Sequence, residues 1–75
     1  TIVADDWTAV YAYPNTTVAN NRILTSDAGV TLEGANSLIE RNYITGLDGS
    51  ATGLPNCGAL NTCAGNWTFG QIPPL

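Results

Sequence analysis

The sequence predicts an all-β fold, a parallel β-helix (solenoid) of about three 21-residue turns. Residues 15–45 contain nearly the same pattern twice, with equivalent residues 21 positions apart. Branched apolar residues recur at this spacing, as Val18 and Ile39 do, and Asn recurs on Asn. In a solenoid, equivalent residues of successive turns stack about 4.8 Å apart. We therefore expect apolar columns inside the coil and Asn columns at its bends.

The matched positions assign the interior and the corners. Ile2, Ile23 and Ile44 form one apolar column. Asn suits a bend because it tolerates the left-handed backbone region and hydrogen-bonds its own neighbours. We expect one corner at Asn21 and Asn42, and another at Asn15 and Asn36.

The phrase GVTLEGANSLIERNYITG, residues 29–46, resembles the repeats of right-handed parallel β-helix proteins of the pectate-lyase-like superfamily. That superfamily includes polysaccharide lyases and hydrolases, epimerases, phage tailspikes and surface adhesins. The resemblance covers roughly residues 1–63 and implies a right-handed coil. It implies no single activity, because function resides in sites grafted on a fold.

The first turn begins with a short tail at residues 1–4, in which Ile2 points inward. Residues 7–13 alternate as a strand does, and we expect Ala9 and Tyr11 to point inward. Their partners in the next turn are Val30 and Leu32. The turn ends with short strands at 16–19 and 22–25.

The second turn repeats this order more regularly. Its predicted strands are 29–33, 37–40 and 43–45, with corners at 34–36 and 41–42. A helix over 35–43 is the competing prediction. Asn in its centre, with β-branched Val18 and Ile39 at matched positions, argues against that helix.

The third turn is looser. Residues 47–63 are rich in Gly and Pro, with Ala51 expected under Val30 and Leu60 under Ile39. The motif NWTFG at 66–70 echoes NYITG at 42–46 with a spacing of 24, which indicates one more strand. We divide the chain into β-helix turns at 1–63, and a terminal strand with a Pro-rich tail at 64–75.

Cys57 and Cys63 are the only cysteines, and we expect them to form a disulfide. At a spacing of 21 they take the corner positions of Asn36 and Asn42, where the bridge would staple the third turn. Two reduced thiols are the alternative. Zinc is disfavoured because two sulfurs without His supply only half a site.

Charge and length restrict the partners. The net charge is −4, with no Lys or His and only Arg22 and Arg41 as cations. Phosphate neutralisation requires clustered cations, so we expect no nucleic-acid and no membrane partner. Seventy-five residues bury little core, and about three uncapped turns leave unpaired strand edges. We expect the chain to pair with itself as a homo-oligomer or with remaining turns of a longer solenoid, in an extracellular or surface-exposed location.

Catalysis would have to use carboxylates. Asp6, Asp27 and Asp48 form a column at the 21-residue spacing, and glycoside hydrolysis needs two acids roughly 5 to 9.5 Å apart. The preferred interpretation is that each Asp caps a bend, and a calcium site is a third possibility. A lyase is less favoured because the chain offers few basic groups. We expect no cofactor and assign no metal ligand.

Contact with carbohydrate is the best-supported function at this stage. Trp7, Tyr13, Tyr43 and Trp67 could stack on the apolar faces of sugar rings. Covering an open end or a subunit interface is an equal alternative for them. Sequons begin at Asn15 and Asn66. We predict a structural or glycan-binding segment of a fibre, adhesin or tailspike-like assembly; a fragment of a polysaccharide-degrading enzyme is the alternative.

Overall fold

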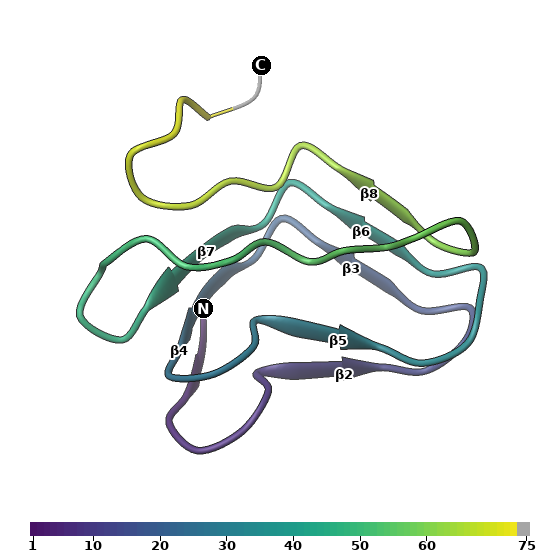
Figure 1. Cartoon of the computed structure of the whole chain (residues 1–75), viewed down its shortest axis with the longest axis horizontal. Coiled ribbons are helices and arrows are strands. Elements are labelled where there is room, and N and C mark those ends of the chain that lie inside the picture. The colour runs from purple at the N-terminus through teal and green to yellow at the C-terminus, as the bar shows by residue number, and fades with distance from the viewer. Residues whose placement is uncertain (74–75) are drawn as a thin grey trace.

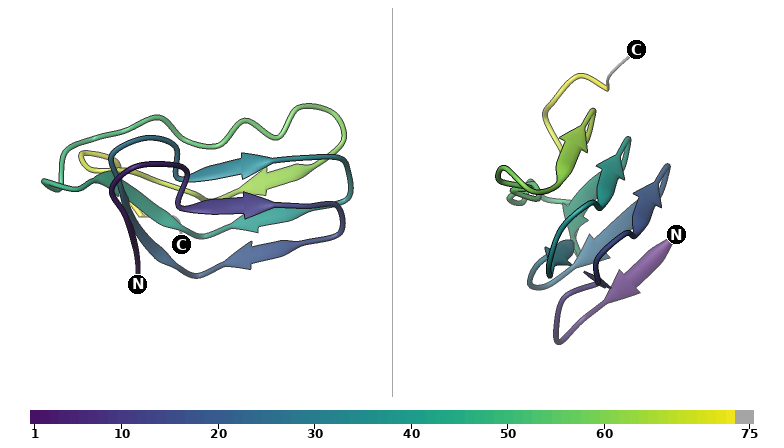
Figure 2. Two further views of the ribbon diagram at one scale, coloured as in Figure 1. Left: turned by 90° about the horizontal axis from the view of Figure 1, so that it is seen from below. Right: turned by 90° about the vertical axis from the view of Figure 1, so that its right-hand side faces the viewer.

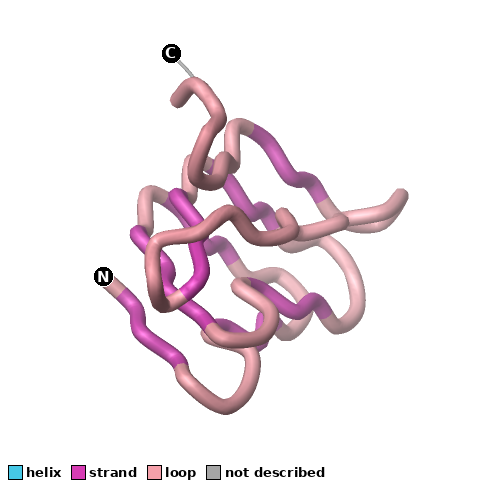
Figure 3. Tube along the Cα trace, turned by 60° about the vertical axis from the view of Figure 1, so that its left-hand side comes forward, coloured by secondary structure: helices cyan, strands magenta, loops and turns pink. Residues whose placement is uncertain are grey.

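The computed structural model describes residues 1–73 and shows a solenoid of about three turns (Figure 1). All regular structure in these residues is strand, and loops connect the strands (Figure 3). The strands in chain order are β1 (Ile2–Ala4), β2 (Val10–Ala12), β3 (Thr17–Ala19), β4 (Arg22–Thr25), β5 (Val30–Leu32), β6 (Leu38–Glu40), β7 (Tyr43–Gly46) and β8 (Thr62–Ala64).

The strands form three parallel sheets that make the sides of the coil. Their orders are β1-β4-β7, β2-β5 and β3-β6-β8. In Figure 1 the chain runs counter-clockwise from β1 through β2 and β3, and Figure 2 shows later turns displaced toward the viewer of Figure 1. The coil is therefore right-handed, the hand that nearly all parallel β connections adopt.

Two of the three sides confirm the 21-residue register. Ile2 pairs with Ile23 and Ile23 with Ile44, while Val18 pairs with Ile39. Ile23, Ile39 and Ile44 are fully buried in one apolar cluster. The apolar columns predicted from the repeat therefore form the core, which is made of branched side chains that pack well on pleated strands.

The third side departs from that register by one residue. Val10 pairs with Val30 and Ala12 with Leu32, a spacing of 20. The predicted partnership of Ala9 and Tyr11 with Val30 and Leu32 was therefore wrong, although Ala9 does pack against the core. Ala12 is fully buried, and Tyr11 turns to the outer face because successive side chains alternate across a strand.

Both predicted corners are present. Asn15 and Asn36 adopt φ values of 64° and 65°, and Asn20 and Arg41, with φ of 59° and 52°, form a second left-handed column before the other corner. Non-glycine residues visit this region rarely, and Asn does so most easily.

A ladder of Asn side chains holds the corner that follows Asn20 and Arg41. Asn42 Oδ1 accepts the Asn21 N–H at 3.0 Å, and Asn66 Oδ1 accepts the Asn42 N–H at 3.0 Å. Asn42 Nδ2 also donates to the Val18 carbonyl at 3.0 Å. Asn42 is fully buried, so this ladder satisfies polar groups that would otherwise lose water without replacement.

The third turn contains 24 residues rather than 21 on the β6 side. Cys63, not Leu60, pairs with Ile39, and Leu60 is 67% exposed. Ala51 forms an antiparallel bridge with Thr45 instead of lying under Val30. The predictions for Leu60 and Ala51 were wrong because three extra residues precede β8, a strand that was not predicted.

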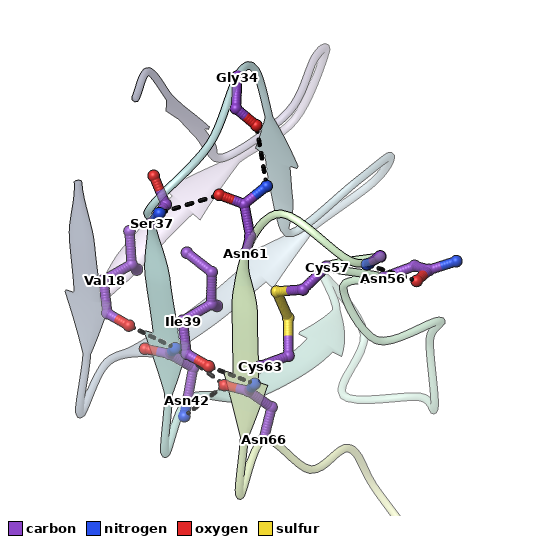
Figure 4. Close-up of a disulfide and its surroundings, with 11 residues drawn as sticks. Val18, Gly34, Ser37, Ile39, Asn42, Asn56, Cys57, Asn61, Cys63 and Asn66 are labelled. Atoms are coloured by element: carbon purple, nitrogen blue, oxygen red, sulfur yellow. Dashed lines mark hydrogen bonds between the residues drawn. A yellow bond between two sulfur atoms is a disulfide. The ribbon is translucent and has the colours of Figure 1, made fainter. Parts of the chain in front are cut away.

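The Cys57–Cys63 disulfide is confirmed, with 5.6 Å between the Cα atoms. The corner positions assigned to these cysteines were wrong. Cys63 continues the apolar column of Val18 and Ile39, while Asn61 takes the position of Ser37 and Asn66 that of the Asn42 corner (Figure 4). The bridge therefore ties the 52–57 loop to β8 from the core side.

The last residues leave regular structure. Trp67 makes one parallel bridge with Tyr43, the only paired position in the strand predicted at 66–69. Residues 71–73 of the predicted tail carry no strand, and Pro74 and Leu75 lie outside the described residues.

Candidate functional site

The outer face of β2 carries three aromatic side chains in mutual contact, which we call the β2 aromatic strip: Trp7, Tyr11 and Tyr13. The Trp7 and Tyr11 rings stack with centroids 5.5 Å apart and planes at 20°. The Tyr11 and Tyr13 rings are 5.3 Å apart and tilted by 52°. Trp7 is 63% and Tyr13 64% exposed, so the strip presents ring surface to solvent.

The strip depends on the one-residue register shift of β2. Tyr11 pairs with Thr31 of β5, and both residues lie between inward positions of their strands. This places Tyr11 between its two aromatic neighbours rather than in the core. Trp7 and Tyr13 were predicted as contact residues, but Tyr11 was not, because the 21-residue repeat assigned it to the interior.

A carboxylate lies beside the strip. Glu33 follows β5 and is exposed. Its carboxylate raises the pKa of Tyr11, first by accepting a hydrogen bond from the phenol and second by its negative charge. Glu33 therefore favours the neutral phenol of Tyr11. Glu33 adds an acceptor to the edge of the aromatic surface.

A second aromatic surface lies at the corner where β4 and β7 begin. Tyr43 and Trp67 lie side by side with centroids 5.3 Å apart and planes at 33°. They line an open hollow of about 430 Å³, which we call the arginine groove. Its complete lining is Asn20, Asn21, Arg22, Arg41, Tyr43 and Trp67.

The solenoid register assembles the arginine groove. Arg22 of β4 pairs with Tyr43 of β7, and Tyr43 bridges to Trp67 in the third turn. Arg41 comes from the left-handed corner position beside them. The two aromatics were predicted as contact residues, but the two arginines were not predicted to lie beside them. The 24-residue echo of NYITG in NWTFG was the signal that could have done so.

The four predicted glycan-contact residues therefore divide between two surfaces. Trp7 and Tyr13 belong to the β2 aromatic strip, and Tyr43 and Trp67 belong to the arginine groove. The two surfaces lie on different sides of the coil, because β2 belongs to one sheet and β4 and β7 to another. The two surfaces are therefore separate.

Of the three Asp residues predicted to form a column, only two line the same hollow. Asp27 and Asp48 line one hollow of about 460 Å³, and Asp6 is exposed in the preceding bend. Asp48 Oδ1 accepts the Ser50 N–H at 3.0 Å, which closes the turn after β7. The Ser50 side chain and then this N–H lower the pKa of Asp48 below its usual value. Asp48 is therefore ionised near neutral pH and caps a bend.

The two sequon asparagines differ in their surroundings. Asn15 is exposed at its corner. Asn66 accepts from Asn42, and its Nδ2 donates to the Ile39 carbonyl at 2.9 Å. A glycan on Asn66 Nδ2 would compete with this last bond of the ladder, whereas one on Asn15 would extend into solvent.

Residues 1–73 form no group of three or more His, Cys, Asp or Glu side chains arranged to hold a metal ion. Within the same residues, no helix has the length and hydrophobicity needed to cross a membrane. Comparisons with protein-family models, with curated proteins and with solved structures find no match to this chain.

Proposed function

We propose that this chain is a structural, glycan-binding segment of a β-helical extracellular assembly such as a fibre, an adhesin or a tailspike. Membership in the pectate-lyase-like superfamily is part of the same proposal. The right-handed parallel coil supports it, and the repeat at 29–46 resembles the repeats of that superfamily. The disulfide supports an oxidising compartment, where such bridges persist.

The β2 aromatic strip is the observation that carries glycan binding. Single exposed apolar residues are common on protein surfaces, but here three rings contact one another and two of them are largely exposed. Together they form one continuous aromatic surface. Aromatic side chains combine an apolar face with a polar edge, which suits the apolar face and equatorial hydroxyls of a sugar. Because the rings follow a strand, the strip fits an extended oligosaccharide better than a single sugar.

The strip also provides polar contacts at its edge. The Tyr11 phenol can donate a hydrogen bond, and the Glu33 carboxylate, which raises the pKa of Tyr11, can accept one. Ligand sites commonly combine apolar surface with a few such polar groups that fix orientation. Sugar hydroxyls could bond to these two groups while the sugar rings stack on Trp7 and Tyr13.

Binding can be tested by titrating the ¹⁵N-labelled chain with cellohexaose and chitohexaose, two neutral oligosaccharides. We expect shifts of the Trp7 indole N–H and of the Val10–Ala12 amides. Trp7→Ala should weaken binding at least fivefold, if a sugar ring stacks as strongly as a nucleic-acid base, for which an aromatic platform contributes about 1–3 kcal/mol. Leu60→Ala, which alters an equally exposed apolar residue outside the strip, is the matched control.

Two results would oppose the proposal. One is the absence of any shift at Trp7, Tyr11 or Tyr13 with either oligosaccharide at millimolar concentration. The other is equal loss of binding in Trp7→Ala and Leu60→Ala, which would indicate non-specific apolar contact. Shifts confined to the strip, with affinity retained in Leu60→Ala, would support it.

A polysaccharide hydrolase is the second candidate, because Asp27 and Asp48 share one hollow. A hydrolase needs one carboxyl group whose raised pKa keeps it protonated as the general acid. The pKa of Asp48 is instead lowered by Ser50. Asp48 suits a nucleophile or a bend cap better than an acid, so glycan binding without cleavage is the better-supported function. Asp27→Asn should leave binding to the strip unchanged.

A further inference from the structure

We infer that the arginine groove is a second glycan site that takes an acidic sugar, meaning a sugar unit bearing a carboxylate or a sulfate. This inference rests on the proposed glycan-binding function and names the ligand class for a surface separate from the β2 aromatic strip. The ligand is identified by three properties of the groove: its charge, its aromatic wall and its amide groups.

The charge of the groove opposes the charge of the rest of the chain. The chain has six acidic residues and only two basic ones, Arg22 and Arg41. Both arginines line the groove, and no carboxylate does. A region with one sign of charge in a protein of the opposite sign concentrates ions that complement it. In this molecule the groove is the place where side-chain charge favours an anion.

The aromatic wall distinguishes a sugar acid from a bare anion. Tyr43 and Trp67 form a continuous ring surface, and both are half-buried, so the surface is held in place. A sugar ring can stack there while its carboxylate or sulfate reaches a guanidinium. Arginine suits this role because its planar fork binds such groups through two parallel hydrogen bonds.

Asn20 and Asn21 complete the groove. Asn21 already uses its Nδ2 on the Ala19 carbonyl at 3.1 Å, which fixes the side chain at the rim. Asn20 is exposed in the left-handed corner position. Its amide can donate to or accept from a sugar hydroxyl. The groove therefore provides a stacking surface, two cations and a neutral polar group within one hollow of about 430 Å³.

The charge of Arg41 can be removed by a substitution that suits the local backbone conformation. Arg41 has a φ of 52°, and the equivalent residue of the preceding turn is Asn20, with a φ of 59°. Arg41→Asn therefore places at this corner the residue that the same corner already holds one turn earlier. Arg22→Gln removes the other cation from a strand position without changing the backbone requirement.

The test compares two oligosaccharides that differ in charge. The chain is titrated with cellohexaose and with its C6-oxidised, carboxylated counterpart, and the Trp67 indole N–H and the arginine Nε–H signals are followed by NMR. We expect the oxidised hexamer to shift these signals and to bind more weakly as salt rises. Arg22→Gln and Arg41→Asn should each weaken its binding about fivefold, as expected for an exposed ion pair.

Two controls separate a site from general electrostatics. Thr17→Lys adds a cation on the exposed outer face of β3, on another side of the coil, and should leave binding of the oxidised hexamer unchanged. Sodium sulfate at matched ionic strength tests a bare anion. Sulfate shifts as large as those of the oxidised hexamer would mean that the sugar ring adds nothing, and this would overturn the assignment to a sugar acid.

The outcomes also separate this inference from the proposed function. Binding of both hexamers with equal affinity, or binding of the oxidised hexamer only at Trp7, Tyr11 and Tyr13, would overturn the inference and leave the glycan function intact. If neither hexamer binds at either surface, the proposed glycan-binding function would be contradicted as well. Groove shifts that a single-stranded oligonucleotide reproduces with higher affinity would assign the groove to a different class of ligand.

Discussion

The first two turns and the third turn of this solenoid are held together by different means. From Ile2 to Gly46 every side of the coil has paired strands, and two sides keep a 21-residue spacing. From residue 47 onward, β8 is the only strand in the described part of the chain, and the side formed by β2 and β5 gains no third strand there. The 52–56 loop lies near β5 across a hollow of about 310 Å³.

The third turn compensates with side-chain and covalent links. Asn61 Oδ1 accepts the Ser37 N–H at 2.9 Å, Asn66 continues the Asn ladder, and the disulfide ties the loop to β8. These bonds attach the third turn to the second at a few positions, whereas strand pairing would attach it along a whole sheet edge. The difference shows that a repeat secures its interior turns through register, whereas the outermost turn of this chain depends on individual bonds.

The largest expected effect comes from the centre of the regular region. Ile39→Asp should unfold the chain, because Ile39 is fully buried between Val18 and Cys63 and an unpaired charge there costs several kcal/mol. That cost is comparable to the whole stability of a small domain. Circular dichroism during heating should show no cooperative transition.

Glu40→Gln is the matched control, since Glu40 is the next residue of β6 and points to the opposite face. It should change the free energy of unfolding by less than about 0.5 kcal/mol. Similar melting curves for the two variants would show that the assignment of the inward and outward faces of β6 is wrong.

The Asn ladder offers the same residue type in both regions. Asn42→Ala removes the acceptor for the Asn21 N–H and the donor to the Val18 carbonyl, at a fully buried position, and should cost about 3 kcal/mol. Asn66→Ala, at the partly exposed end of the ladder, should cost roughly half as much because water can replace its bonds. Denaturant unfolding measures both, and equal costs would contradict a weaker outer turn.

The sequence predicted the parts of the fold that repeat. Ile2, Ile23 and Ile44 were aligned correctly because one interior column forces the same residue type at the same spacing. The Asn corners were found for a similar reason, since Asn is favoured both for left-handed backbone and for bonding along a column. Counting at a fixed spacing failed wherever turn length changed, by one residue at β2 and by three before β8.

The candidate site was predicted residue by residue but not as surfaces. Trp7, Tyr13, Tyr43 and Trp67 were selected by type, and each has an aromatic neighbour. Tyr11 was missed because a shift of one residue exchanges the two faces of a strand. The arginine groove was missed because it needs the true 24-residue spacing that brings Trp67 beside Tyr43.

A smaller effect should follow reduction of the disulfide. Opening the short Cys57–Cys63 loop should cost about 2 kcal/mol, and the loss should stay in the outer turn. Hydrogen exchange of the reduced chain should speed up at the Thr62 and Trp67 amides, which bond to Ser37 and Asn42, while the Leu38 and Tyr43 amides stay protected. Equal loss of protection at all four amides would mean that the turns unfold as one unit.

The smallest effect concerns the left-handed corner shared by all three turns, where Asn20, Arg41 and Gly65 follow one another. Arg41→Asn should stabilise the chain slightly, by less than about 1 kcal/mol, because Asn adopts positive φ at lower cost than Arg. The reciprocal variant Asn20→Arg should destabilise it by a similar amount. Denaturant unfolding of the pair gives a direct comparison, and shifts of the same sign would show that side-chain contacts, not the backbone, decide which residue occupies this corner. If the two variants change the free energy of unfolding in opposite directions, the backbone conformation decides the preference. Arg41 then remains at the rim of the arginine groove at only a small cost in stability.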